Sequence, residues 1–304
     1  MSQRKPYPQI FKTPEDHFKY ACMTGDIETV EKHLNCDKDL VNLCHKGRTI
    51  LYLTMEKNQM EVAQLLINSG ANPNILNTWK FSFPLLTAVR RGEVAPVLFL
   101  LKNGANPDLA NKRGEYPLLE AVKLKKYEIT KLLLEYSMIR IHTTLCCIRE
   151  YETSLLSADC LPLNIFKEIM KTFCYSPSVN RPFKHLKWKW IEFPLYHAVS
   201  DASKSFVSLL LQYGADPNQE GEGQTVGSLL WHISIPHKGI STKLGLEITE
   251  ELLRYGANPN RESTVLHNFR FRGMNLIRFA IDGGKYDLIE LLLKYNVDIP
   301  LASI

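Results

Sequence analysis

The sequence predicts an all-α solenoid of about eight stacked helix-turn-helix units that project loop or hairpin fingers. Two short phrases repeat along the 304 residues, and the distance between them is nearly constant. Apolar residues at helical spacing precede each copy of one phrase. One helix pair cannot bury its apolar face alone, so a chain with this pattern stacks its pairs on one another.

The first phrase is Gly-Ala followed by Asn or Asp, then Pro. Its four copies and one degenerate copy are Gly70–Asn74, Gly104–Asp108, Gly214–Asn218, Gly256–Asn260 and Asn296–Pro300. Each follows an apolar stretch with i, i+3, i+4 spacing, which predicts a helix that buries one face. Glycine then ends that helix in the left-handed conformation, and Asn/Asp-Pro turns the chain into a loop.

The second phrase predicts the first helix of each unit. Its clear copies are Phe83–Val89, Tyr116–Val122 and Phe193–Val199. Proline in the first helical turn loses no hydrogen bond, and the small alanine lets the helix lie close to its partner. The alanine lies 16 positions before the glycine in Ala88/Gly104 and Ala198/Gly214. Weaker copies keep this distance at Ala121/Ser137, Ala280/Asn296, Thr54/Gly70 and Ala21/Asp37.

These phrases, spaced by 33 to 34 residues, resemble the ankyrin repeat over almost the whole chain. The resemblance implies eight units after a loose N-terminal arm at residues 1–12, which is polar and holds two prolines. The array spans 13–304, with units at about 13–45, 46–79, 80–112, 113–141, 142–190, 191–223, 224–264 and 265–304.

Three departures from the ankyrin pattern affect the expected packing. The histidine of the first helix, which helps to tie neighbouring repeats together, is replaced by Tyr52, Leu86, Leu119, Tyr196 and Leu230. We therefore expect packing to replace a polar network between units. Unit five is degenerate, with helices expected over residues 144–155 and 163–173. Unit seven has an eight-residue insertion, expected as a loop around residues 235–245 because of its Pro, Gly and Ser content.

The sequence lacks the motifs of an enzyme or a cofactor protein. It has no glycine-rich phosphate loop, no GxSxG motif and no convergent pair of carboxylates, so we expect no catalysis and no cofactor. His142, Cys146 and Cys147, like Cys44 and His45, lack the paired spacing of a zinc site and are interpreted as packing residues. The net charge of +5 is too small to favour nucleic acid.

Composition also bears on location. Seven cysteines in a chain of this size indicate a reduced compartment. The N-terminus has no apolar signal segment, and the apolar runs are shorter than the roughly 20 residues of a membrane span. We therefore expect a cytoplasmic or nuclear protein with no membrane association.

The fingertips are the predicted partner-binding surface. Residues four to six places before the first-helix proline position, which Ile50 and Leu276 hold in two units, form a basic and aromatic stripe: Lys46, Trp79, Lys80, Lys112, Arg113, Trp188, Lys189, Trp190, Phe271 and Arg272. Tryptophan and arginine dominate binding hot spots, so the expected partner is an acidic, partly apolar protein segment. In the alternative interpretation the lysines only aid solubility and the tryptophans lie beneath adjacent fingers.

Two further sets of residues are candidates. The turns between the two helices of units three and four carry a basic patch: Arg90, Arg91, Lys123, Lys125 and Lys126. It would suit an acidic ligand, or would simply be solvated. Asn74, Asn218 and Asn260 occupy the place at which ankyrin repeats resemble substrates of the asparagine hydroxylase, which implies possible hydroxylation.

The resemblance implies a protein-binding scaffold or adaptor. One alternative is a substrate receptor of a ubiquitin ligase. The chain ends at Asp298–Ile304 directly after the last helix pair, so recruitment would need a repeat surface or a separate subunit. The other alternative is a viral or bacterial effector that mimics host ankyrin proteins.

Overall fold

The computed structural model describes residues 11, 13–77, 82–137, 178–184, 191–219, 228–234, 242–262, 274–295 and 297–298. The chain divides into two compact units, Met1–Arg113 and Gly114–Ile304. They are called the first unit and the second unit below, and each contains several of the repeats that the sequence predicts. Helices dominate both units, and β-structure in the described part of the chain is limited to two short hairpins and one isolated bridge. The predicted all-α fold of repeated helix pairs is confirmed.

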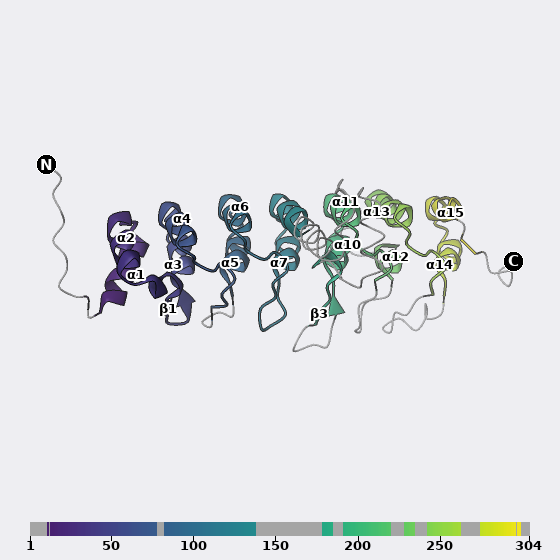
Figure 1. The fold of residues 1–304 in the computed structure, drawn as a ribbon. Helices are drawn as coiled ribbons and strands as arrows, with labels where there is room; N and C mark the ends of the chain where they lie inside the picture. Colours follow the sequence, from purple (N-terminus) through teal and green to yellow (C-terminus); the bar gives the residue numbers. More distant parts are fainter. Residues whose placement is uncertain are drawn as a thin grey trace, which may run out of the picture. The chain divides into compact units, whose positions relative to one another are not determined.

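The first unit contains three described helix pairs. The helices are α1 (Pro14–Thr24) with α2 (Ile27–Cys36), α3 (Ile50–Glu56) with α4 (Met60–Asn68), and α5 (Pro84–Arg91) with α6 (Val94–Lys102). A 3-10 helix, η1 (Lys38–Asn42), leads into the hairpin of β1 (Cys44–His45) and β2 (Arg48–Thr49). Within this unit α1, α3 and α5 form one row of helices, here called the inner helices, and the loops project beyond them (Figure 1).

The second unit repeats the arrangement. Its elements are α7 (Pro117–Lys123) with a helix over residues 127–137, η2 (Ser178–Asn180), β3 (Phe183–Lys184), β4 (Ile191–Glu192), α10 (Pro194–Ser200) with α11 (Lys204–Gln212), α12 (Leu229–Ser234) with α13 (Thr242–Arg254), and α14 (Leu276–Asp282) with α15 (Tyr286–Leu293). Inner helices pack in succession, α7 on α10 and α10 on α12. The second helices of the pairs, here called the outer helices, do the same: α11 packs on α13, and α13 packs on α15.

The glycine of the first phrase ends four of the described outer helices, α4, α6, α11 and α13, as predicted. At Gly104 φ is +83°, its N–H donates to Leu101 O at 3.3 Å, and the N–H of Ala105 donates to Leu100 O at 2.9 Å. This pair of bonds is a Schellman motif. A Cβ at Gly104 would meet no atom within 4 Å, so glycine is needed there for its backbone conformation and not for space. Gly70, Gly214 and Gly256 make the same motif.

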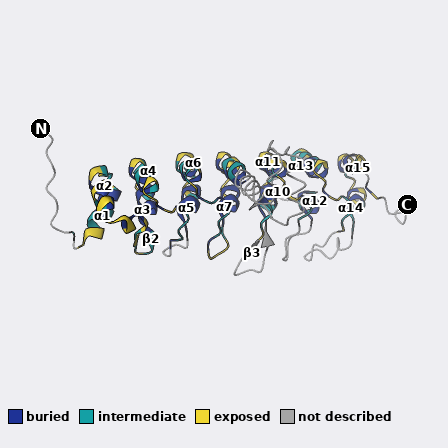
Figure 2. Ribbon diagram, viewed as in Figure 1, coloured by how far each residue is buried: buried dark blue, intermediate teal, exposed yellow. Residues whose placement is uncertain are grey.

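The second phrase also behaves as predicted. Pro84, Pro117 and Pro194 are the first residues of their helices. The small residues of the phrase, among them Ala88 and Ala198, are buried. Figure 2 shows the buried residues gathered on the helix faces that point toward neighbouring helices, and the exposed ones on the loops and outward faces.

The turns between paired helices need one residue with positive φ. Glycine fills this place at Gly25, Gly92 and Gly284, but in the second unit Lys125 (φ 55°) and Ala202 (φ 49°) take it. A residue with a Cβ costs roughly 1 kcal/mol in the left-handed region. The turn geometry therefore overrides the local preference of these two residues.

The structure corrects two details of the seventh unit. Helix α13 begins at Thr242, so residues 242–245 are helical and do not belong to the expected loop. The Oγ of Ser228 accepts the N–H of Trp231 at 3.4 Å, as Thr49 Oγ1 accepts that of Tyr52 at 3.2 Å. This register puts Trp231, rather than Leu230, in the place of the ankyrin histidine. The helices expected in unit five, over 144–155 and 163–173, lie outside the described residues.

Candidate functional site

The best-described finger of the first unit is the β1–β2 hairpin. Cys44 pairs with Thr49 and His45 with Arg48, and Lys46 and Gly47 form the two-residue turn with φ of 50° and 73°. Two successive positive φ values are typical of hairpin turns whose twist matches that of the strands. Lys46 is exposed at this tip, where the sequence predicted it.

A second described fingertip carries Lys112 and Arg113, both exposed. The side chain of Asn111 holds this turn, because its Oδ1 accepts the N–H of Arg113 at 2.9 Å. The other predicted fingertip residues, Trp79, Lys80, Trp188, Lys189, Trp190, Phe271 and Arg272, lie outside the described residues. The stripe therefore stays a prediction, with exposure described at three of its positions.

The predicted basic patch divides between the two units, and each part is partly neutralised. In the first unit Arg90 is half-buried, and Arg91 lies 2.9 Å from Glu93. In the second unit Lys123 is half-buried, while Lys125 and Lys126 are exposed. Lys125 Nζ lies 3.3 Å from Asp201 Oδ2. Ion pairs of this exposure contribute less than about 1 kcal/mol.

A small hollow lies between α3 and α5 in the first unit. Its floor and rim are Tyr52, Met55, Glu56, Pro84, Thr87, Ala88, Arg91, Glu93 and Pro96. Tyr52, Met55, Pro84 and Ala88 are buried in the floor, whereas the charged side chains stand at the rim. We call this set the α3–α5 groove.

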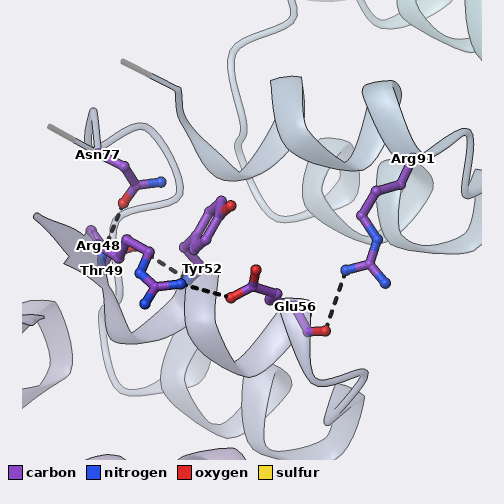
Figure 3. A network of polar contacts seen from close by, with 6 residues as sticks. All are labelled: Arg48, Thr49, Tyr52, Glu56, Asn77 and Arg91. Atoms are coloured by element: carbon purple, nitrogen blue, oxygen red, sulfur yellow. Dashed lines mark hydrogen bonds and ion pairs between the residues drawn. The ribbon is translucent and has the colours of Figure 1, made fainter. Parts of the chain in front are cut away.

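Polar contacts fix the rim of the α3–α5 groove (Figure 3). Arg48 Nη1 lies 3.1 Å from Glu56 Oε2, and Arg91 Nη1 donates to the backbone oxygen of Glu56 at 3.3 Å. Each of these charged side chains keeps a quarter or more of its surface exposed, for example 39% at Arg91 and 36% at Glu56. The rim thus carries charged side chains that ion pairs and a backbone hydrogen bond hold in place, next to an apolar floor.

The hairpin is tied to the next finger through Asn77. This buried side chain accepts the backbone N–H of Thr49 at 2.8 Å through its Oδ1 (Figure 3). Asn77 also forms a backbone bridge with Ser82. The bond fixes the start of α3, on which Tyr52 and Glu56 of the groove lie.

Asparagines at the loop bases link successive repeats inside each unit. In the first unit Asn74 Oδ1 accepts the N–H of Asn106 at 2.7 Å, and Asn74 Nδ2 donates to Gly104 O at 3.0 Å. In the second unit Asn218 bonds in the same way to Asn258 and Gly256. Asn42, Asn180 and Asn260 each accept the N–H of the corresponding residue of the next repeat. We call this set the asparagine ladder.

Polar ties between neighbours are therefore present, which corrects the expectation that packing alone replaces them. Besides the ladder, the Tyr116 hydroxyl donates to Arg181 O at 2.6 Å, and burial raises the pKa of Tyr116. Trp231 is fully buried, and its Nε1 donates to Arg261 O at 3.1 Å. The sequence did not predict either hydrogen bond, because a tyrosine or a tryptophan at these positions does not by itself indicate a bond to a neighbouring repeat. The recurring Asn directly after the proline of the first phrase, as in Pro73-Asn74, was the available signal.

The three hydroxylation candidates are members of this ladder. The side chains of Asn74 and Asn218 bond through both amide atoms, and Asn260 Oδ1 accepts from Asp298 N at 2.7 Å. An enzyme acting on them would first have to break these bonds. Hydroxylation stays a prediction, and a mass increase of one oxygen on the corresponding peptides would test it.

Metal-ligating groups do not converge in the described residues, where no three His, Cys, Asp or Glu side chains come together. At the Cys44–His45 candidate, His45 Nε2 lies 3.0 Å from Lys19 Nζ. Burial and the charge of Lys19 lower the pKa of His45. His142, Cys146 and Cys147 lie outside the described part. Among the described helices, none combines the length and apolarity that crossing a bilayer requires.

Comparison with known proteins agrees with this geometry. Residues 18–111 match the family described as ankyrin repeats (3 copies). A putative ankyrin repeat protein of fowlpox virus is 25% identical over 205 residues, which cover 67% of this chain and 27% of that protein. The human transient receptor potential cation channel subfamily A member 1 is 28% identical over 165 residues, 54% of this chain and 13% of the channel subunit. This chain thus spans well under a third of either relative.

A solved structure supports the fold over most of the chain. The ankyrin repeat domain of Bcl-3, a member of the IkappaB protein family, superimposes with a TM-score of 0.58. It covers 93% of this chain and 98% of that domain at 21% identity, so it supports the fold alone. Ankyrin repeats are protein–protein interaction modules, and the sites described above are candidates for that role.

Proposed function

We propose that this chain, which is an ankyrin-repeat protein, serves as a scaffold or adaptor that binds another protein through its fingers and inner helices. The α3–α5 groove is the observation that carries the proposal. It combines a buried apolar floor at Tyr52 and Met55 with charges held in place at Arg91 and Glu56. Recognition sites commonly pair an apolar anchor with a few positioned polar groups.

The proposed ligand is an acidic, partly apolar segment of the partner. Lys46, Lys112 and Arg113 are exposed at fingertips of the same unit as the groove. Cations at the rim of an interface mainly raise the association rate and impose salt dependence. The apolar part of the segment would occupy the groove, and its carboxylates would be attracted by the fingertips. The protein would act in the cytoplasm or nucleus.

Charge reversal tests this assignment directly. A triple variant with Lys46→Glu, Lys112→Glu and Arg113→Glu should weaken capture of an acidic partner by about tenfold or more at low salt. Lys102→Glu is the matched control, because Lys102 is an exposed cation on outer helix α6. Equal binding by the triple variant and the control would refute the fingertip assignment.

A second experiment concerns the aromatic part of the predicted stripe. The double variant Trp188→Ala/Trp190→Ala should lose partner capture in a pull-down, since truncated aromatic anchors typically cost 2 kcal/mol or more. Unchanged binding would remove these tryptophans from the interface. Circular dichroism would show whether the variant keeps its helix content.

The similarity to a fowlpox virus ankyrin repeat protein favours one alternative, an effector that mimics host ankyrin proteins. The other is a substrate receptor of a ubiquitin ligase. Co-purification from cells with mass spectrometry separates them from a simple adaptor. Reproducible cullin or adaptor subunits would support the ligase role, and one stable client without them would support the scaffold.

A further inference from the structure

The turn between α7 and the helix over residues 127–137, in the second unit, exposes two large apolar side chains. Leu124 is 42% exposed, and Tyr127 is 38% exposed. The turn itself does not require leucine, and burial in the fold does not account for it. Counted from the small residue of the inner helix, five other repeats have a polar residue or glycine in the place of Leu124: Thr24, Lys57, Arg91, Asp201 and Gly283.

Lysines flank these two side chains in the sequence. Residues 123–131 hold four lysines and one glutamate, whereas the equivalent segments of the same five repeats hold at most two lysines or arginines each. Lys126 and Lys131 are exposed and form no ion pair with any residue in the described part of the chain. We call the following residues the Leu124–Tyr127 patch: Lys123, Leu124, Lys125, Lys126, Tyr127 and Lys131.

Contacts to a neighbouring helix pair of the second unit hold part of the patch in place. The ring of Tyr127 meets that of Phe206 edge-on, with 5.5 Å between the centroids and 81° between the planes. Lys125 Nζ lies 3.3 Å from Asp201 Oδ2. This ion pair neutralises part of the charge of Lys125 but not that of the two other exposed lysines. Side chains that are already positioned lose little conformational freedom when a ligand binds, which favours binding at such a patch.

We propose that the Leu124–Tyr127 patch binds an acidic segment of a partner protein that carries at least one large apolar side chain. Carboxylates of the segment face Lys126 and Lys131, and its apolar side chain covers Leu124 and Tyr127. Charge complementarity supports this occupant, since the patch holds four lysines beside a tyrosine, a residue type that often carries binding energy at interfaces. The patch extends the second-unit part of the predicted basic patch. It shares no residue with the fingertip stripe or the α3–α5 groove, so it does not rest on the proposed function.

An anionic bilayer fits the patch less well than a protein segment does. Helices that lie on a membrane insert a long apolar face, whereas the patch offers two apolar side chains, each exposed over less than half of its surface. Two such side chains match the few apolar anchors of a short protein segment.

Fluorescence anisotropy of a labelled acidic peptide tests the proposal on the full chain. The probe is a short fluorescein-labelled peptide of glutamates with two phenylalanines, titrated at low salt. Lys126→Glu/Lys131→Glu should weaken its binding by about tenfold or more, because two attractions become repulsions. Leu124→Ser, made independently, should weaken it by about tenfold through loss of apolar contact. A peptide with glutamine in place of glutamate should not bind.

Matched control variants change exposed residues elsewhere in the second unit. Lys243→Glu/Lys294→Glu reverses two exposed cations on α13 and α15, and Leu293→Ser removes a leucine that is 50% exposed. Both should bind the probe as the wild type does. Equal weakening by the controls and the patch variants would mean that the probe senses only net charge or overall apolarity, and would overturn the proposal.

Two further measurements identify the surface and its occupant. The triple variant Lys46→Glu, Lys112→Glu and Arg113→Glu removes binding at the fingertips and should still bind the probe. Loss of binding in this variant, or equal binding by the wild type and the patch variants, would overturn the proposal and leave the fingertip assignment intact. Vesicles of phosphatidylcholine and phosphatidylserine are the second probe. Vesicle binding that the two lysine reversals of the patch abolish, without peptide binding, would assign the patch to a membrane and overturn the proposal.

Discussion

Replacement of Asn74 by alanine should destabilise the first unit more than the same change at Asn42. Asn74 joins two repeats through two hydrogen bonds, to the N–H of Asn106 and to Gly104 O, at 2.7 and 3.0 Å. Asn42 contributes one such bond, to the N–H of Asn72, at 2.9 Å. Each bond contributes a net 0.5–1.5 kcal/mol. We therefore expect a loss of about 2 kcal/mol for Asn74→Ala and about 1 kcal/mol for Asn42→Ala.

Urea denaturation of the full chain, followed by circular dichroism, measures both losses. With a urea dependence of about 2 kcal/mol per molar, Asn74→Ala should lower the midpoint of the first unit's transition by about 1 M, and Asn42→Ala by half as much. Hydrogen exchange at the amide of Asn106 would report the same bond locally. If the two variants cost the same, or if Asn74→Ala costs less than about 0.5 kcal/mol, the ladder does not stabilise the stack as described.

Three other predictions concern single positions. Ala202→Gly should raise the stability of the second unit by about 1 kcal/mol, because Ala202 has a φ of 49°; a lower melting temperature would contradict this. Trp231→Phe should lower the free energy of unfolding by about 1 kcal/mol in chemical denaturation, because the indole hydrogen bond to Arg261 O is lost. An unchanged free energy of unfolding would show that this bond does not stabilise the fold. Burial and neighbouring His17 lower the pKa of His33 below 6.5, so the unfolded chain takes up a proton first. The contribution of His33 to the unfolding free energy of the first unit should therefore be constant above pH 6.5 and decrease as the pH falls below it. His33→Gln should make the unfolding free energy depend less on pH in this range. An unchanged pH dependence would exclude His33 as its source.

The repeated phrases allowed most of the fold to be predicted. Proline in the first turn, such as Pro84, favours the start of a helix, and a glycine such as Gly104 ends one. Both effects depend only on the local backbone conformation. The apolar spacing in between fixes which faces must be buried. The spacing of Ala88 and Gly104 therefore predicted the helix pair, and the structure confirms it.

The site was less predictable, because it depends on residues brought together from different repeats. The fingertip positions of Lys46, Lys112 and Arg113 could be predicted from their distance to the first residue of the next inner helix, Ile50 or Pro117, and all three are exposed. The rim of the α3–α5 groove could not. It forms because Arg91 reaches the backbone oxygen of Glu56, 35 residues earlier in the chain.

The sequence by itself determined the repeat, most of its helix boundaries and its loop turns, since each follows from backbone preferences and apolar periodicity within one repeat. Only the tertiary structure decided how neighbouring units are tied. The bonds of Asn74 and Trp231 join residues about 30 positions apart, and their partners are backbone groups, which leave no signature in the sequence. It also decided that Leu293 is exposed whereas Leu211 and Leu253, three places before the same phrase in other repeats, are buried, because burial there depends on what packs against the helix pair and not on the residue itself.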